Sequence, residues 1–367
     1  MDAGTLIQEL EDALPSRTMA ERAQALRRVT DLFLFGASGQ APAQIAVFDD
    51  VMMRLMGDIE TSIRAELSLR LAAIPNVPPK LIRRLATDTE IAVAGPVLRS
   101  SPALDDDILV HSARTAAQDH LLAISCRAAV SEPVTDELVE RGDRRVALSV
   151  VGNAGARLSE RGRTVLVERS RDDDQLAAGI WSRPDVPHQH LLRLLAIASD
   201  NVRRTLEALD HQRVNLIRNT MAEVSNTIQR RIRVNTRDYT EAERTVTGLH
   251  GAGDLTGARI EAFAASGQFE ETTLALALLC DLPVGACERA MVQDRAELIL
   301  LITKAAGLTW ETTKAVLRLR DGTREAPARE FEADLATFSR LRQETARKAI
   351  QFVRMRERAG ESRSAVP

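Results

Sequence analysis

Residues 88–143 read DTEIAVAGPVLRSSPALDDDILVHSARTAAQDHLLAISCRAAVSEPVTDELVERGD and contain the same unit twice. Each copy has an aspartate, an apolar helix opening at Ile91 or Leu121, and a short turn that holds Pro102 or Pro133. One apolar residue then precedes a residue type that caps a helix or occupies its first turn. The repeated unit therefore predicts a fold made of paired helices.

The same pattern extends beyond this stretch in both directions. The apolar residue that opens each second helix recurs at steps of 29, 27, 30, 24 and 28 residues, at Phe48, Val77, Leu104, Val134, Leu158 and Val186. The residues expected to start those helices are Asp49, Pro78, Asp105, Thr135, Ser159 and Pro187. Aspartates that can complement the helix dipole are expected to close each unit before the next first helix, at Asp58, Asp88, Asp119, Asp143, Asp173 and Asp200.

Helix pairs of this length carry apolar side chains on more than one face, so neighbouring pairs must cover them. With no strand pattern in the chain, the sequence predicts an all-α protein: an α-solenoid of two-helix repeats of about 28 residues, with a long central helix and a long C-terminal helix. Three parts are expected: an N-terminal helical-repeat domain at 1–200, a long connecting helix at 201–238, and a C-terminal helical domain at 239–367 that continues the repeats.

Local signals predict further helix starts before and after the repeated series. Residues 1–35 are expected to form two helices, and Thr18 with Glu21 has the spacing of a capping box. The later second helices are expected to open at Leu255-Thr256, Leu282-Pro283 and Leu308-Thr309. Residues 330–358 are expected to form one amphipathic helix with a basic end.

Composition sets the broad class. The 367 residues are 44% hydrophobic and 28% charged, which is typical of a globular protein, and the net charge of −3 gives no general reason to bind polyanions. No apolar run reaches the ~18 residues needed to span a bilayer, and the acidic N-terminus is unlike a signal peptide. Three cysteines form no metal or disulfide framework, so a cytoplasmic protein with reduced cysteines is expected.

The predicted connecting helix contains no proline or glycine. Five apolar residues step through it at heptad spacing, at Val214, Ile217, Met221, Val224 and Ile228. This 214–228 seam spans only about two heptads, which is short for a coiled coil. Packing within the chain is the favoured interpretation, and a homodimer contact through the seam is the alternative.

The same segment is basic, with eight arginines against three acidic residues between 201 and 237. The candidate interaction face consists of Arg203, Arg204, Arg230, Arg231 and Arg233. Such a face can contact phosphates, but aromatic residues make up only 3% of the chain, so stacking platforms for single strands are few. A solvated or salt-bridged helix face is the favoured interpretation, and nucleic-acid binding is the alternative.

Two aspartate runs and two histidines could suggest metal ligands. The runs 105–107 and 172–174 sit where helices are expected to start, so capping and dipole compensation are favoured over a metal site. His188 and His190 follow Pro187, and residues two apart do not share a helix face. A solvated helix start is therefore expected for these histidines.

No recognised catalytic constellation is present. Cys280 and Cys287 flank Pro283 and are expected to pack in the interior on different helices. The glycine-rich residues 251–257 follow a predicted helix and lack a lysine after the last glycine, so a turn is favoured over a phosphate loop. We expect no catalytic, cofactor-binding or metal-binding residues, no cofactor, and no enzymatic activity.

Four segments resemble a known bacterial family: FDDV at 48–51, RAEL at 64–67, VAGPVL at 93–98 followed by Ser101-Pro102, and KAAGLTW at 304–310. The family is domain of unknown function 2336, an uncharacterised family found mainly in alphaproteobacteria, and the resemblance covers about residues 45–320. It implies a cytosolic bacterial protein with HEAT-like helices. It brings no established catalytic or ligand residues.

The sequence thus favours a non-enzymatic helical-repeat scaffold or adaptor that mediates protein–protein interaction, because stacked repeats present a continuous surface. The alternative is a nucleic-acid-binding HEAT-like protein that uses the local arginine face. No membrane partner is expected. An enzyme with an unrecognised site is the least favoured hypothesis.

Overall fold

The computed structural model describes residues 18–36, 41–57, 59–209, 213–234, 237–293, 295–321 and 328–364. Across these residues the chain is all-helical and forms no strand, apart from one isolated bridge between Val130 and Ala156. No helix in this part of the chain combines the length and the apolar character needed to cross a membrane. The chain divides into two compact units, Met1–Leu166 and Val167–Pro367. The domain limits predicted at residues 200 and 238 remain a prediction.

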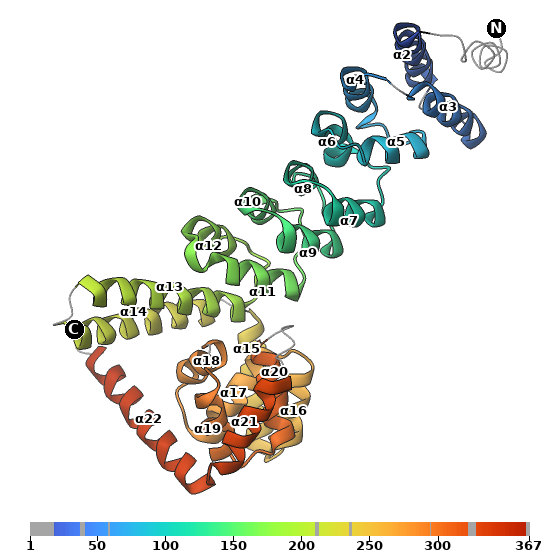
Figure 1. Cartoon of the computed structure of the whole chain (residues 1–367). Coiled ribbons are helices and arrows are strands. Elements are labelled where there is room, and N and C mark those ends of the chain that lie inside the picture. Colours follow the sequence, from blue (N-terminus) through green and yellow to red (C-terminus); the bar gives the residue numbers. More distant parts are fainter. Residues whose placement is uncertain are drawn as a thin grey trace. The chain divides into compact units, whose positions relative to one another are not determined.

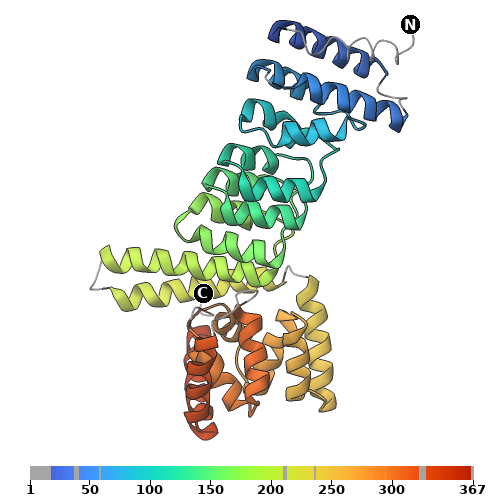
Figure 2. The same cartoon turned by 45° about the vertical axis from the view of Figure 1, so that its right-hand side comes forward.

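The helices that begin in the first unit are short and follow one another closely. They are α2 (Met19–Gly36), α3 (Pro42–Leu55), α4 (Thr61–Leu71), α5 (Pro79–Ala86), α6 (Ile91–Ser100), α7 (Asp106–Thr115), α8 (Gln118–Ser125), α9 (Glu132–Arg141), α10 (Arg144–Gly152) and α11 (Glu160–Arg169). In one row α4 packs on α6, α6 on α8 and α8 on α10, and in a second row α3 packs on α5 and α7 on α9 (Figures 1 and 2). Fully buried leucines lie between the rows, among them Leu98, Leu121 and Leu138.

Several predicted helix starts are confirmed by their caps. The Asp105 carboxylate accepts the amide of Ile108 at 3.0 Å and so caps α7. Asp143 caps α10 in the same way through Val146. Pro78, Ser159 and Pro187 directly precede α5, α11 and α13 (His188–Leu209).

The capping box at the first described helix is also confirmed. The Thr18 amide donates to the Glu21 carboxylate at 2.8 Å, and the Glu21 amide donates to the Thr18 hydroxyl at 3.4 Å. The first of the two helices predicted over residues 1–35 lies outside the described residues, as does Asp58.

The pattern misplaces other helix starts. Phe48 and Asp49 lie inside α3 rather than at a helix opening, and Thr135 lies inside α9, which already begins at Glu132. Asp119 and Asp200 lie within α8 and α13 instead of before a helix. Capping residue types also occur inside helices, where a distant partner can satisfy their side chains, so residue type and spacing alone do not fix a helix start.

After the end of α11, the second unit consists of a short 3-10 turn and a series of helices that vary from 8 to 22 residues in length. They are η2 (Ser170–Asp172), α12 (Asp174–Trp181), α13, α14 (Val214–Val234), α15 (Arg237–Ala252), α16 (Gly257–Ala265), α17 (Phe269–Cys280), α18 (Val284–Val292), α19 (Glu297–Ala305), α20 (Trp310–Asp321), α21 (Ala328–Arg340) and α22 (Gln343–Ser364). One hydrophobic core, with Ile260, Leu276 and Ile299 at its centre, holds α15 to α22 together. The predicted starts at Thr256, Pro283 and Thr309 are confirmed, because these residues directly precede α16, α18 and α20.

The single long helix predicted over 201–238 was wrong. The segment contains the end of α13 and the whole of α14, which pack against each other. Pairing lets the two helices cover each other's apolar sides, and an ion pair of 2.8 Å between Arg218 and Glu207 joins them. The C-terminal helix predicted over 330–358 is likewise two helices, α21 and α22, which separate at Leu341 and Arg342.

Candidate arginine-lined site in the second unit

The predicted arginine face is divided between α13 and α14, and acidic side chains neutralise much of it. Arg203 forms ion pairs with Asp200 and with Glu207, and Arg204 pairs with Asp200 at 2.9 Å. The hydrogen bond that Arg203 donates to Asp200 is the main reason why the pKa of Arg203 is raised, and the hydrogen bond that Glu207 accepts from Arg218 is the main reason why the pKa of Glu207 is lowered. The two helices therefore share a network of ion pairs.

Arg233 has a buried partner. Its guanidinium binds the Glu288 carboxylate of α18 through two hydrogen bonds of 2.8 and 2.6 Å, and the Glu288 side chain is only 2% exposed. Burial lowers the pKa of Arg233, but the hydrogen bond and the charge of Glu288 outweigh it and leave this pKa above its usual value. The guanidinium also lies 5.6 Å from the ring centre of Tyr239, within cation–π range. Arg233 is thus a structural residue that ties α14 to α18.

Arg230 and Arg231 differ from the other three predicted residues. Both side chains are exposed on α14, and neither forms an ion pair or hydrogen bond with another described residue. Arg230 points into a pocket of about 380 Å³, and Arg231 is not among the residues that line it. The structure therefore does not bring the five predicted arginines together as one free basic surface.

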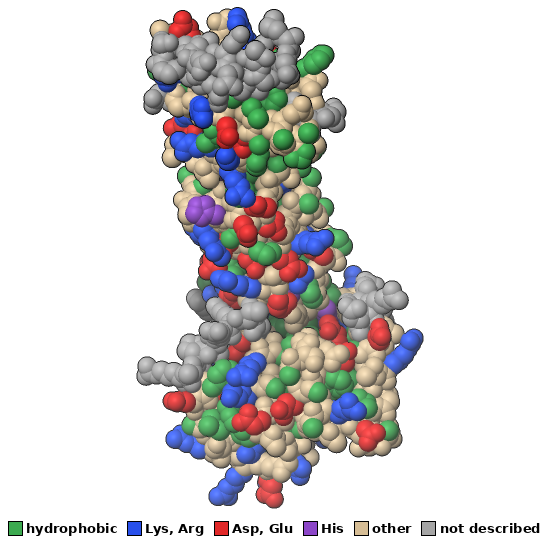
Figure 3. Space-filling view, turned by 90° about the vertical axis from the view of Figure 1, so that its right-hand side faces the viewer, with side chains coloured by type: hydrophobic (Ala, Val, Ile, Leu, Met, Phe, Trp, Pro, Cys, Tyr) green, Lys and Arg blue, Asp and Glu red, His purple; other side chains and the backbone are tan. Residues whose placement is uncertain are grey.

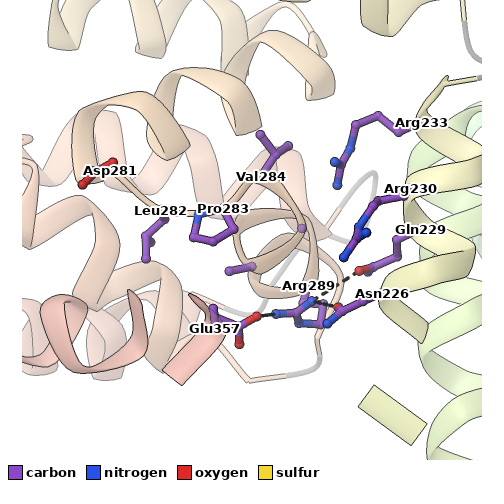
Figure 4. A pocket seen from close by; sticks show the side chains of 12 residues that line it. Asn226, Gln229, Arg230, Arg233, Asp281, Leu282, Pro283, Val284, Arg289 and Glu357 are labelled. Atoms are coloured by element: carbon purple, nitrogen blue, oxygen red, sulfur yellow. Dashed lines mark hydrogen bonds and ion pairs between the residues drawn. The ribbon is translucent and has the colours of Figure 1, made fainter. Parts of the chain in front are cut away.

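The pocket at Arg230 lies between α14, α18 and α22 (Figure 4). Its central side chain is Arg289, which donates to Asn226 and Gln229 and forms an ion pair with Glu357. The Arg233 side chain reaches from α14 to Gly285 of α18, where an added Cβ would lie 3.4 Å from a guanidinium nitrogen of Arg233. These contacts fix Arg289 in place, with Arg230 and Arg233 extending from the opposite wall (Figure 4).

A larger depression of about 730 Å³ adjoins this pocket and shares Asn226, Gln229, Arg289 and Glu357 with it. We name it the arginine groove, because eight arginines of the described part of the chain line it: Arg171, Arg193, Arg203, Arg204, Arg218, Arg289, Arg295 and Arg356. The acidic lining residues are Asp172, Asp200 and Glu357. The apolar ones are Ala196, Ile197, Met221, Ala222 and Val292.

Sequence reasoning missed part of this groove. Arg289, Arg295 and Arg356 lie 56 or more residues beyond Arg233, the last arginine of the predicted face. They join Arg203 and Arg204 only because α18 and α22 pack beside the α13–α14 pair. The basic end noted on the predicted C-terminal helix was the one available signal, since Arg356 belongs to it.

The two aspartate runs act at helix starts, as predicted. Asp105 and Asp173 cap α7 and α12, and the following aspartates lie in or before the first turns. Among the described residues, no three His, Cys, Asp or Glu side chains come together in a way that could hold a metal ion. The glycine-rich stretch 251–257 joins α15 to α16, in agreement with the predicted turn.

The prediction for His188 and His190 was wrong. Both side chains are buried, at 3% and 2% exposure, rather than solvated. His188 Nδ1 lies 3.6 Å from Oε1 of Glu270, which belongs to α17. A proline before a helix marks the helix start, but it carries no information about which distant helix covers the first turn.

The three cysteines differ in exposure, which predicts how each reacts with a thiol reagent. Cys126 is exposed, Cys280 is partly buried and Cys287 is buried. Burial raises the pKa of Cys280 to about 11 and also raises the pKa of Cys287, and the thiolate is the reactive form. At about pH 8, a thiol reagent is expected to modify Cys126 in the native chain and the other two only after unfolding. Mass spectrometry of the labelled chain measures this, with Cys126→Ser as the control, and rapid native labelling of Cys287 would contradict it.

The comparison with known proteins gives a family. No curated protein and no solved structure matches the chain significantly. The family described as "Uncharacterised protein conserved in bacteria (DUF2336)" matches residues 93–351, a span that runs from α6 into α22 and includes the whole arginine groove except Arg356 and Glu357. Since this match covers well over half of the 367 residues, the chain belongs to the DUF2336 family.

Proposed function

We propose that the chain is a non-enzymatic scaffold or adaptor, built as an α-solenoid of HEAT-like two-helix repeats, that binds other proteins in the bacterial cytoplasm. The observation that carries the proposal is the repeated packing in the first unit, where α4 contacts α6, α6 contacts α8 and α8 contacts α10. Rows of equivalent helices present a continuous surface to a partner, which is how repeat proteins bind.

Ion pairs between successive repeats support the proposal. They include Lys80 with Asp50, Arg64 with Asp88, Arg83 with Asp105, Arg114 with Glu137, and Arg145 with Asp119. Basic and acidic side chains accordingly intermingle on the face of the first unit seen in Figure 3. A mixed surface of this kind suits recognition of a protein better than recognition of a uniform polyanion.

Affinity capture followed by crosslinking tests the scaffold. The tagged full-length chain is incubated with native bacterial cytosol, and bound proteins are crosslinked at carboxylates before mass spectrometry. We expect a specifically bound protein with crosslinks to acidic residues of α4 to α10, and none with the tag alone. Repeated capture without a specific protein, or crosslinks that avoid these helices, would argue against the proposal.

Nucleic-acid binding is the second candidate, favoured by the two exposed arginines Arg230 and Arg231 on α14. Replacing both with glutamate is then expected to weaken oligonucleotide binding, and the remaining binding should fall as salt rises. Binding that is insensitive to salt or to these substitutions would exclude this candidate.

A homodimer through the 214–228 seam also stays a proposal. Helix α13 packs on α14, so Val214, Ile217, Met221 and Ile228 are half-buried within one chain, while Val224 is 49% exposed. If the seam joins two copies, Val224→Glu is expected to convert a dimer to a monomer in light scattering. A monomeric native chain would exclude the dimer.

A further inference from the structure

The arginine groove carries more positive charge than its acidic residues offset. Glu207 pairs with both Arg203 and Arg218, and Asp200 pairs with both Arg203 and Arg204, so three guanidinium groups share two carboxylates. Two further lining residues, Arg295 and Arg356, are exposed and form no ion pair or hydrogen bond with another described residue. The groove therefore has an excess of cations that face solvent.

We propose that the arginine groove binds an acidic segment of a partner protein that also carries apolar side chains. This inference rests on the proposed scaffold function and names the chemistry of one partner. Carboxylates of the segment would meet the cations at the groove's rim, Arg295 and Arg356, and at Arg230 in the adjoining pocket. Arginine suits this role because its planar guanidinium binds a carboxylate through two parallel hydrogen bonds.

The apolar part of the lining favours a protein segment over a nucleic acid. Ile197 and Met221 line the groove from α13 and α14, and Val292 lines it from the end of α18. None of the described lining residues is aromatic, so the groove offers no platform on which a base could stack. Apolar and acidic side chains of one peptide can occupy both kinds of surface, whereas a phosphate backbone would leave the apolar surface unused.

The walls of the groove are held in place before any ligand binds. Asn226, Gln229 and Glu357 hold Arg289 at the junction with the pocket, and Gln229 is itself only 3% exposed. On the α13–α14 wall, Glu207 bridges Arg203 and Arg218. Fixed side chains lose little conformational freedom on binding, so the groove is preorganised for its ligand.

Fluorescence anisotropy with the full-length chain tests the inference. The probe is a short labelled peptide that alternates Glu-Glu and Leu-Leu, and the comparison probes are the same peptide with glutamine for glutamate and a single-stranded oligonucleotide. The test variant is Arg230→Glu/Arg295→Glu/Arg356→Glu. The matched control is Arg244→Glu/Arg259→Glu, which reverses two exposed arginines of α15 and α16 outside the groove. Circular dichroism and tryptophan fluorescence establish that both variants are folded.

The Glu-Leu peptide is expected to bind the native chain and the control equally, and the triple variant at least about tenfold more weakly. The affinity of the Glu-Leu peptide for the native chain should fall with added salt. The glutamine peptide should bind the native chain at least about tenfold more weakly than the glutamate peptide. Equal binding by the native chain and the triple variant, or preference for the oligonucleotide, would overturn the inference. Crosslinks of captured proteins to α4–α10 would still support the scaffold, so the two proposals can fail separately.

Discussion

Replacing Arg233 with alanine is expected to lower the free energy of unfolding of the second unit by about 3–5 kcal/mol, because the substitution leaves the Glu288 carboxylate buried without its cation. Both tryptophans, Trp181 and Trp310, belong to this unit, and Trp310 packs against Phe338 at 5.6 Å between ring centres. Urea unfolding followed by tryptophan fluorescence therefore measures the loss of stability in the second unit.

Two variants distinguish the contribution of the buried Arg233–Glu288 pair to stability from the general effect of removing an arginine. Arg231→Ala removes a neighbouring exposed arginine and is expected to change the free energy of unfolding by less than about 0.5 kcal/mol. The double substitution Arg233→Met/Glu288→Leu removes both charges and is expected to restore most of the loss, because no unpaired charge remains in the interior. An Arg233→Ala loss as small as that of Arg231→Ala would show that the pair does not stabilise the fold.

Local signals in the sequence predicted helix starts well where the cap lies next to its helix. Thr18 with Glu21, Asp105 and Thr256 all cap the predicted helices, since each contact spans only three residues. Helix ends were harder to predict when no proline or glycine marks them. The separation of α13 from α14 and of α21 from α22 arises because paired helices bury more apolar surface than one long helix can, and that gain depends on tertiary packing.

The candidate site was predictable only in part for the same reason. Clustered arginines between 201 and 237 pointed to the correct helices, and Asp200 stands at the i,i+3 spacing that pairs it with Arg203 on a helix. Nothing in the sequence, however, indicated that Glu288 would neutralise Arg233, or that Arg289 would reach the same place from a helix more than fifty residues away. Charge density along a chain locates charged helices, whereas the free charge of a surface depends on which acids pack beside it.

Replacing Asp49 is expected to cause the second large loss of stability. The repeat pattern in the sequence had placed this residue at a helix start, which was wrong. It is 1% exposed in the middle of α3, and its carboxylate accepts the amides of Lys80 and Leu81 at 2.9 and 2.8 Å. These are first-turn amides of α5, which have no acceptor within their own helix. Asp49, in α3, therefore caps α5, across 31 and 32 residues of sequence.

Asp49→Ala is expected to lower the free energy of unfolding of the first unit by about 2–4 kcal/mol, because a buried amide and a partly buried one lose a charged acceptor. Thermal unfolding measured by circular dichroism gives the overall loss, and hydrogen exchange should be faster in the amides of α5. Asp49→Asn keeps one acceptor oxygen and is expected to lose less.

The adjacent residue provides the matched control for Asp49. Asp50 carries the same side chain on the same turn, but its contact is an exposed ion pair with the Lys80 ammonium group. Exposed pairs contribute little, so Asp50→Ala is expected to leave the melting midpoint unchanged. If Asp49→Ala and Asp50→Ala behaved alike, the stabilisation would come from acidic charge near α5, and not from a buried cap that joins α3 to α5.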